Sequence, residues 1–278
     1  MLALGERTLV MGVINVTPDS FSDGGQRFDP QRAIDDGVRM VADGADILDI
    51  GGESTRPGAE PLAAEEELLR VLPVIEGLRA RVDAPISIDT YKAAVAERAM
   101  DLGAVIINDI SAFAYEPELA TVAAHRRAAV VLMHNRGRSR AMYAAADYRD
   151  VAAEVASELQ ARVIAARDAG IPTERIILDP GLGFAKHAEH SLTALAELGT
   201  LADLGFPILC GPSRKSFLKA GLGDVGPDER MWGTAAAVAA SVMLGAHIVR
   251  VHDVAEMVQV VRVTDAIRDR MSHYNKAR

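Results

Sequence analysis

The amino-acid sequence predicts an α/β fold, a single (β/α)8 barrel of the TIM type, closed by parallel strands. Three observations lead to it. Short apolar runs alternate with longer amphipathic segments along the whole chain. Eight such pairs follow one another, and strands covered on both faces typically read as continuous apolar runs. The length of 278 residues also suits a barrel of this kind, which needs about 250 residues.

Each expected strand is short and rich in β-branched residues, as buried parallel strands are. The strands are expected at Leu9–Val16, Asp46–Gly51, Ile86–Asp89, Val105–Ile110, Ala129–His134, Ile176–Asp179, Pro207–Gly211 and Ile248–His252. The helices are expected at Pro30–Gly44, Ala63–Val82, Tyr91–Leu102, Pro117–Arg126, Tyr148–Gly170, Leu192–Leu204, Glu229–Leu244 and Val254–Met271. Pro30 suits the first turn of a helix, and Gly44, Gly103, Gly170 and Gly205 stand where helices are expected to end.

An open, doubly wound sheet is the competing α/β architecture. Its usual dinucleotide fingerprint is missing, because the Gly-rich segment from Gly181 to Lys186 lacks the third glycine. The same segment does not have the spacing of a P-loop either. No Pro/Ser-rich linker or low-complexity block marks a boundary, so we expect residues 1–278 to form one domain.

The composition narrows the classes of partner. A formal net charge of −9 argues against nucleic acid and acidic membranes, which require a basic surface. No run approaches the roughly 18 apolar residues of a membrane span. Cys210 is the only cysteine, which excludes an intrachain disulfide and favours a reducing compartment. A cytoplasmic protein is the expectation.

Polar residues gather at the expected strand ends, where active sites of such barrels lie. They are Asn15, Asp49, Asp89, Asn108, His134, Asp179, the stretch Ser213-Arg214-Lys215, Arg250 and His252. Helix capping could account for the Asp, Asn and Ser residues, but not for Lys215, Arg250 or His252. Arg250 and His252 are two apart and project from one strand face. The alternative for them is a structural salt bridge to Asp49 or another buried carboxylate.

These residue types predict two poles in one site. Asp89, Asn108 and Asp179 can read the hydrogen-bond donors and acceptors of a heterocycle, whereas the cations can hold phosphate. Lys215 follows the seventh expected strand, beside the region where this fold usually binds phosphate. The ligand is therefore expected to be small, polar and anionic at one end.

At these positions the sequence resembles the dihydropteroate synthase family of pterin-binding enzymes. One signature runs from Met11 to Gly25, and a second from Asp49 to Gly58. Six shorter matches follow in order at Ser87–Thr90, Asn108–Ile110, Leu132–His134, Leu178–Phe184, Ser213–Lys215 and Arg250–Asp253. The resemblance spans nearly the whole chain.

The resemblance implies a transferase that condenses 6-hydroxymethyl-7,8-dihydropterin diphosphate with p-aminobenzoate, giving 7,8-dihydropteroate and pyrophosphate by dissociative displacement. It implies Mg²⁺ as cofactor and a homodimer formed through late helices. A helical stripe of Met257, Val258, Val261 and Ile267 is expected to pack on the barrel or on a partner subunit.

The family's site residues can be transferred to matching positions only. The resemblance implies catalytic roles for Asp89, Lys215, Arg250 and Asp23. It implies a pterin subsite formed by Asp89, Asn108, Asp179, Lys215, Met133, Ile110, Phe184 and Gly211, and diphosphate contacts from Asn15, Thr55, Arg56, Arg250 and His252. It also implies a p-aminobenzoate pocket formed by Phe21, Pro57 and Ser213, with Asn15 as the metal ligand. The loop 18–28 is longer than most strand-to-helix connections, which favours a lid.

Two other functions stay open from the sequence. A pterin-dependent methyltransferase would share the pterin-reading Asp and Asn positions but would not need the diphosphate contacts of Arg250 and His252. A non-catalytic paralogue would keep the barrel as a binding module. The intact pterin and phosphate positions argue against the second alternative.

Overall fold

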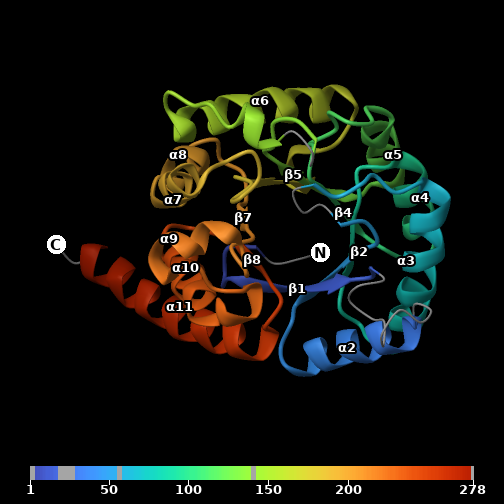
Figure 1. Cartoon of the computed structure of the whole chain (residues 1–278), viewed down its shortest axis with the longest axis horizontal. Helices are drawn as coiled ribbons and strands as arrows, with labels where there is room; N and C mark the ends of the chain where they lie inside the picture. The colour runs from blue at the N-terminus through green and yellow to red at the C-terminus, as the bar shows by residue number, and fades with distance from the viewer. Residues whose placement is uncertain (1–3, 18–28, 55–57, 139–141, 277–278) are drawn as a thin grey trace.

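The computed structural model describes residues 4–17, 29–54, 58–138 and 142–276. Eight parallel strands form an inner ring, and helices surround it (Figure 1). The strands are β1 (Leu9–Asn15), β2 (Ile47–Gly51), β3 (Ile86–Asp89), β4 (Ile106–Asp109), β5 (Ala129–Met133), β6 (Ile176–Asp179), β7 (Leu209–Cys210) and β8 (Ile248–Val251). The predicted (β/α)8 barrel is confirmed.

The outer layer consists of helices that follow the strands in turn. They are α2 (Pro30–Ala42), α3 (Ala64–Arg79), α4 (Ala93–Asp101), α5 (Glu118–Arg126), α6 (Val151–Asp168), α7 (Ala188–Ala196), α8 (Leu198–Ala202), α9 (Lys219–Leu222), α10 (Met231–Met243) and α11 (Val254–Lys276). Short 3₁₀ turns lie at Met142–Ala145, Thr173–Arg175, Ser216–Leu218 and Pro227–Glu229. No helix in the described part of the chain is long and apolar enough to cross a membrane.

The ring closes where β6 meets β7, and this is its weakest seam. The other neighbours pair in register, in the order β6-β5-β4-β3-β2-β1-β8-β7. Between β6 and β7 there is one bridge, Leu178 to Ile208, and the backbone N–H of Leu178 donates to the carbonyl oxygen of Pro207 at 2.9 Å. Strand β7 has two residues where five were predicted, because Pro207 and Pro212 have no N–H to offer a ladder.

Two apolar layers stabilise the barrel. A large cluster lies between the strands and the helices, and a smaller one fills the inside of the barrel toward the amino-terminal ends of the strands. The smaller cluster takes alternate, inward-facing residues from the strands: Leu9, Met11, Ile47, Ile106, Val131, Ile177, Leu209 and Ile248. The next inward position lies nearer the mouth, and on four strands it is polar: Asp49, Asn108, Asp179 and Arg250.

One helix was predicted wrongly. The segment Leu192–Leu204, expected as one helix, belongs to two: α7 begins earlier, at Ala188, and ends at Ala196, and α8 begins at Leu198. Glu197 lies between them at φ −102° and ψ 29°, outside helical geometry, and its N–H donates to the carbonyl oxygen of Thr193. The local sequence contains no proline that would predict this break between helices.

Candidate active site

The inward-facing side chains at the carboxyl ends of the strands form one polar floor. Asp49 on β2 pairs in register with Ser87 on β3, and Asp89 on β3 pairs with Asn108 on β4. Alternate residues of a strand face the same side, so these groups point into the barrel with Arg250 of β8. The structure thus brings together polar strand ends, predicted from the sequence, from four different strands.

Arg250 is the centre of this floor. Its Nε donates to Oδ2 of Asp49 at 2.6 Å, and its terminal nitrogen donates to Oδ2 of Asp89 at 2.7 Å. Asn108 also donates to Oδ2 of Asp49, at 3.0 Å. The salt bridge to Asp49, which the sequence left as the alternative for Arg250, is therefore present. The contact with Asp89 fits the same structural alternative, because Asp89 is a second, largely buried carboxylate.

The charges of the floor depend on one another. Burial raises the pKa of Asp89, and the nearby Arg250 guanidinium opposes that rise. Burial alone would lower the pKa of Arg250, but Asp49 and Asp89 outweigh it and raise that pKa. Arg250 thus stays a cation, and Asp49, with no exposed side-chain surface, depends on it for neutralisation.

Asp179 lies at the end of β6 on the other side of the mouth. Its Oδ1 accepts a hydrogen bond from the backbone N–H of Gly181 at 2.7 Å, which fixes the carboxylate. Burial raises the pKa of Asp179 to about 6, while the Gly181 hydrogen bond and the cations Lys215 and Arg250 lower it. At neutral pH the ionised carboxylate can accept hydrogen bonds from a flat ligand with N–H groups.

An apolar wall stands beside this carboxylate. Met133, Ile110 and Phe184 pack together in a buried cluster with Tyr91 and Ala185. Nζ of Lys215 lies 3.9 Å from the centre of the Phe184 ring, a cation–π distance. Gly211 lies next to Arg250, whose Cβ would be 3.7 Å from a Cβ placed on the glycine. A flat ring with polar edges would find an apolar face and buried polar groups here.

Ser213 and His252 connect the ends of β7 and β8. The Ser213 hydroxyl lies 2.9 Å from Nδ1 of His252 and accepts from the backbone N–H of His252 at 3.2 Å. Burial lowers the pKa of His252 to about 3, with Arg250, Arg214 and Lys215 adding to the effect. His252 is therefore neutral at pH 7. If the hydroxyl donates to Nδ1, the proton of His252 is on Nε2, so it could meet an anion as a hydrogen-bond donor but not as a cation.

Two members of the predicted ring face elsewhere. Arg214 forms a bidentate pair with Asp253 at 2.6 and 3.1 Å and contacts Asp228 at 2.8 Å, so it clamps the loop after β7. It has φ +58°, a left-handed backbone that turns it away from Lys215. His134 is buried behind the apolar wall, where its Nε2 lies 3.1 Å from Oε2 of Glu158. Neither side chain belongs to the floor.

The loop-borne candidates are not placed. Phe21, Asp23, Thr55, Arg56 and Pro57 lie outside the described residues. Asn15 ends β1 at the mouth and is half-buried.

Sequence reasoning missed two buried lysines. Lys92 forms ion pairs with Glu53 and Glu67, and the Tyr91 hydroxyl donates to Glu53 at 3.0 Å, which fixes the chain after β2. Lys186 lies under the Gly-rich loop after β6. Neither lies at a strand end, and an isolated lysine before a helix usually faces solvent.

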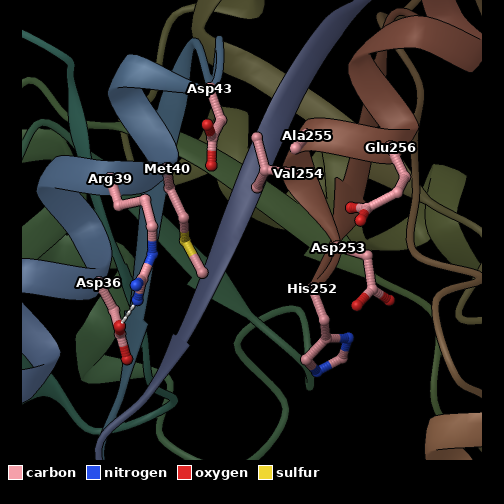
Figure 2. A pocket seen from close by; sticks show the side chains of 9 residues that line it. All are labelled: Asp36, Arg39, Met40, Asp43, His252, Asp253, Val254, Ala255 and Glu256. Carbon is pink, nitrogen blue, oxygen red and sulfur yellow. Dashed lines mark hydrogen bonds and ion pairs between the residues drawn. The ribbon is translucent and has the colours of Figure 1, made fainter.

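A separate cavity of about 320 Å³ lies outside the barrel, between α2 and the start of α11 (Figure 2). Four of its nine lining residues are acidic, and the lining does not include Asp89, Asn108 or Asp179. The residues around it are Asp36, Arg39, Met40, Asp43, His252, Asp253, Val254, Ala255 and Glu256. Only His252 belongs to both places, and the acidic lining is unsuited to an anion.

Comparison with known proteins agrees with this geometry. A family described as "Pterin binding enzyme" matches residues 11–252. The chain is 50% identical over 263 residues to dihydropteroate synthase of Synechocystis, covering 95% of this chain and 91% of the relative. It is 45% identical over 266 residues to the Bacillus subtilis dihydropteroate synthase, covering 96% and 90%.

Solved structures give the same result. Dihydropteroate synthase from Clostridium difficile, crystallised with pteroic acid, superposes with a TM-score of 0.90 at 44% identity, covering 96% of this chain and 99% of that one. The Xanthomonas albilineans enzyme in complex with 7,8-dihydropteroate gives 0.86 at 42% identity, covering 95% and 94%. Because the likeness extends over nearly the full length in sequence and fold, the chain belongs to the dihydropteroate synthases, within the pterin-binding enzyme family.

Proposed function

We propose that this chain condenses 6-hydroxymethyl-7,8-dihydropterin diphosphate with p-aminobenzoate to 7,8-dihydropteroate and pyrophosphate. One observation carries the proposal: the mouth of the barrel holds buried Asp179 and Asn108, an apolar wall around Phe184, and the cations Lys215 and Arg250. The relatives are dihydropteroate synthases, which supports this reaction over a pterin-dependent methyltransferase or a non-catalytic paralogue.

The pterin would lie flat against Phe184, Met133 and Ile110. Its amino group and ring N–H are donors, and Asp179 offers a carboxylate to accept from them. Asn108 can both donate and accept, although its Nδ2 already donates to Asp49. Asp89, Lys215 and Gly211 would border the ring on the side of Arg250. A flat heterocycle thereby has its hydrogen-bonding edge and its faces recognised separately.

The diphosphate would lie over the cationic side of the floor. Arg250 supplies a fixed positive charge, and neutral His252 can donate from Nε2. Asn15, Thr55 and Arg56 are assigned to the same group by the family motifs. Charge that builds up on the departing pyrophosphate is stabilised best by donors already in place, because they need no reorganisation.

Mg²⁺ fits this site only together with the substrate. Within the described ranges, no group of three or more His, Cys, Asp or Glu side chains could hold a metal ion. Mg²⁺ usually keeps several waters and takes one or two protein ligands beside substrate phosphates. The side-chain oxygen of Asn15, at the mouth end of β1, is a suitable ligand of that kind. When bound, the ion would neutralise charge on the diphosphate.

The reaction would proceed by dissociation before attack. The bond between the exocyclic methylene carbon and the diphosphate oxygen breaks, and its electron pair leaves with pyrophosphate. The pterin ring delocalises the positive charge on the methylene, with the Asp89 carboxylate nearby. The neutral aromatic amine of p-aminobenzoate then forms the C–N bond and loses a proton. Ser213, with Phe21 and Pro57 from the loops, would hold p-aminobenzoate, and Asp23 would act from the loop 18–28.

Positional isotope exchange tests both the order of steps and the metal. The substrate is labelled with ¹⁸O at the oxygen that joins the methylene carbon to the diphosphate, and no amine is added. We expect this label to move into the non-bridging oxygens of the same phosphate when Mg²⁺ is supplied. The scrambling should be lost when EDTA is added. Bond cleavage that strictly requires the amine would contradict dissociation, and scrambling that persists in EDTA would contradict the role of Mg²⁺.

We also propose a homodimer formed through α10 and α11. Met257, Val258 and Val261 of the predicted stripe are buried against the barrel, whereas Ile267 is 51% exposed. Val263, Ile267 and Met271 are four residues apart, so they form an exposed apolar line along α11. Met243 and Leu244 add apolar surface at the end of α10, which packs against α11. A row of neighbouring exposed apolar side chains is the kind of surface that a second subunit can cover.

Light scattering after size exclusion would measure this association. The wild-type chain is expected at twice its 29.6 kDa mass, and Ile267→Glu at the mass of one chain. Leu69→Glu is the matched control, because Leu69 is 76% exposed on α3, which α2 separates from α11 in the ring of helices (Figure 1). A monomeric wild type, or equal effects of the two variants, would contradict the assignment.

A further inference from the structure

Lys186 is buried beneath the loop that joins β6 to α7. Its side chain is only 2% exposed, although lysines are rarely buried to this extent. Its ammonium group meets three neutral acceptors: Nδ1 of His134 at 2.8 Å, and the carbonyl oxygens of Phe184 at 3.2 Å and Gly181 at 3.3 Å. An ammonium group has three N–H donors, so each can be satisfied. Burial lowers the pKa of Lys186 to about 7, so these three acceptors are what stabilises its charged form.

The far side of Lys186 is connected to helix α6. Burial lowers the pKa of His134 to about 4, so its ring is neutral and can accept the Lys186 hydrogen bond on Nδ1. Its Nε2 then carries a proton toward Glu158, 3.1 Å away. Glu158 is paired in turn with Arg136. Lys186 is thus connected to α6 by two polar contacts, the first to His134 and the second from His134 to Glu158.

The loop above Lys186 has an unusual backbone. Gly181, Gly183 and Ala185 have φ values of +67°, +79° and +47°, all in the left-handed region. A Cβ on Gly181 would lie 2.0 Å from the carbonyl oxygen of His134, so only glycine fits there. Ala185 has a Cβ and adopts this conformation at a cost. Lys186 binds the carbonyl oxygens of Gly181 and Phe184, and the Gly181 oxygen also accepts from the backbone N–H of Phe184 at 3.0 Å.

This loop controls two groups of the proposed pterin subsite. The backbone N–H of Gly181 holds the Asp179 carboxylate at 2.7 Å, and Phe184 supplies the ring beneath Lys215. The Lys186 cation also acts on Asp179 through space, since it helps to lower the pKa of that carboxyl. A shift of the loop would therefore move the hydrogen-bonding edge and the stacking face of the subsite together.

We infer that Lys186 is a positioning residue for the pterin, which sets Asp179 and Phe184 through the carbonyl groups of Gly181 and Phe184. This inference rests on the proposed function, because it assigns the subsite to a pterin. It predicts a selective defect: recognition of the pterin should weaken, while p-aminobenzoate, held by other loops, should be bound as before.

The test compares Lys186→Met with wild type in two measurements. Binding of 6-hydroxymethylpterin, followed by calorimetry, is expected to weaken by about tenfold, as for residues in one coupled network. The KM for p-aminobenzoate at saturating pterin diphosphate should stay within about twofold of wild type. Lys219→Met is the matched control, since Lys219 is an exposed lysine paired with Asp224 and should change neither value.

The outcomes separate the inference from the function it rests on. If wild type fails to bind the pterin, the proposed function fails. If wild type binds it and Lys186→Met binds equally well, the inference about Lys186 is wrong. Equal loss of both substrates with a lower melting temperature would show a purely structural role and would also overturn it. Where Lys186→Met does not fold, Lys186→Gln is measured instead, and an affinity equal to wild type has the same meaning.

Discussion

Asp179→Asn is expected to lower kcat/KM for the pterin diphosphate by about 10³-fold, because a site built to hydrogen-bond a ligand loses most when a buried partner is mismatched. The amide can still accept from Gly181, but its NH₂ group would face the donors of the pterin. Steady-state kinetics at saturating p-aminobenzoate and calorimetry with 6-hydroxymethylpterin would both report the loss. A variant with pterin affinity near wild type would contradict the assignment of Asp179.

The same substitution should remove a pH dependence. Burial raises the pKa of Asp179 to about 6, above its value in the unfolded chain. The protonated carboxyl therefore adds to the stability of the folded state at low pH, and this added stability is lost as the pH rises through 6. Pterin donors require the ionised form. Affinity for the pterin should therefore rise from pH 5 to pH 7, by about tenfold per unit below the pKa. In Asp179→Asn the rise around pH 6 should be lost, and only the dependence near pH 7 should remain, where burial places the pKa of Asp89.

Arg250→Met is expected to destabilise the fold by about 3–5 kcal/mol and to abolish measurable turnover. Asp49 has no exposed side-chain surface and would lose its cation, while Asp89 would lose its ion pair with Arg250. Urea denaturation gives the change in the free energy of unfolding. Arg214→Met is the matched control: it also removes an arginine with two carboxylate partners, but at a more exposed place, so a smaller loss of stability is expected.

A double variant separates the two roles of Arg250. Asp49→Asn in the Arg250→Met background removes the uncompensated buried charge, so most of the lost stability should return. Turnover should not return, because the cation near the diphosphate is still missing. Recovery of activity together with stability would show that Arg250 acts only as a structural partner of Asp49.

The fold was largely predictable because each buried strand of a parallel barrel is a continuous apolar run in the sequence. Two strands, Ile86–Asp89 and Ile176–Asp179, have the predicted bounds, and most of the others differ by one residue at an end. The larger errors arose where local chemistry decides. Pro207 and Pro212 shorten β7, and the backbone of Glu197 divides one expected helix into two.

The polar floor was predictable for a similar reason: residues at the carboxyl ends of parallel strands share one mouth. Direction was harder to predict than position. Arg214 and Lys215 are neighbours, yet the left-handed backbone at Arg214 sends its side chain to Asp253 while Lys215 reaches Phe184. Lys186 and His134 meet only through the fold, 52 residues apart, and no local pattern reveals such a pair.

The most direct test of the proposed reaction is synthesis by the purified chain. The protein is incubated with 6-hydroxymethyl-7,8-dihydropterin diphosphate, p-aminobenzoate and Mg²⁺, and both products are quantified. We predict 7,8-dihydropteroate and pyrophosphate in equal amounts from wild type, and product formation about 10³-fold slower from Asp179→Asn at low pterin diphosphate. A folded wild-type chain that binds the pterin but forms no dihydropteroate would contradict the account.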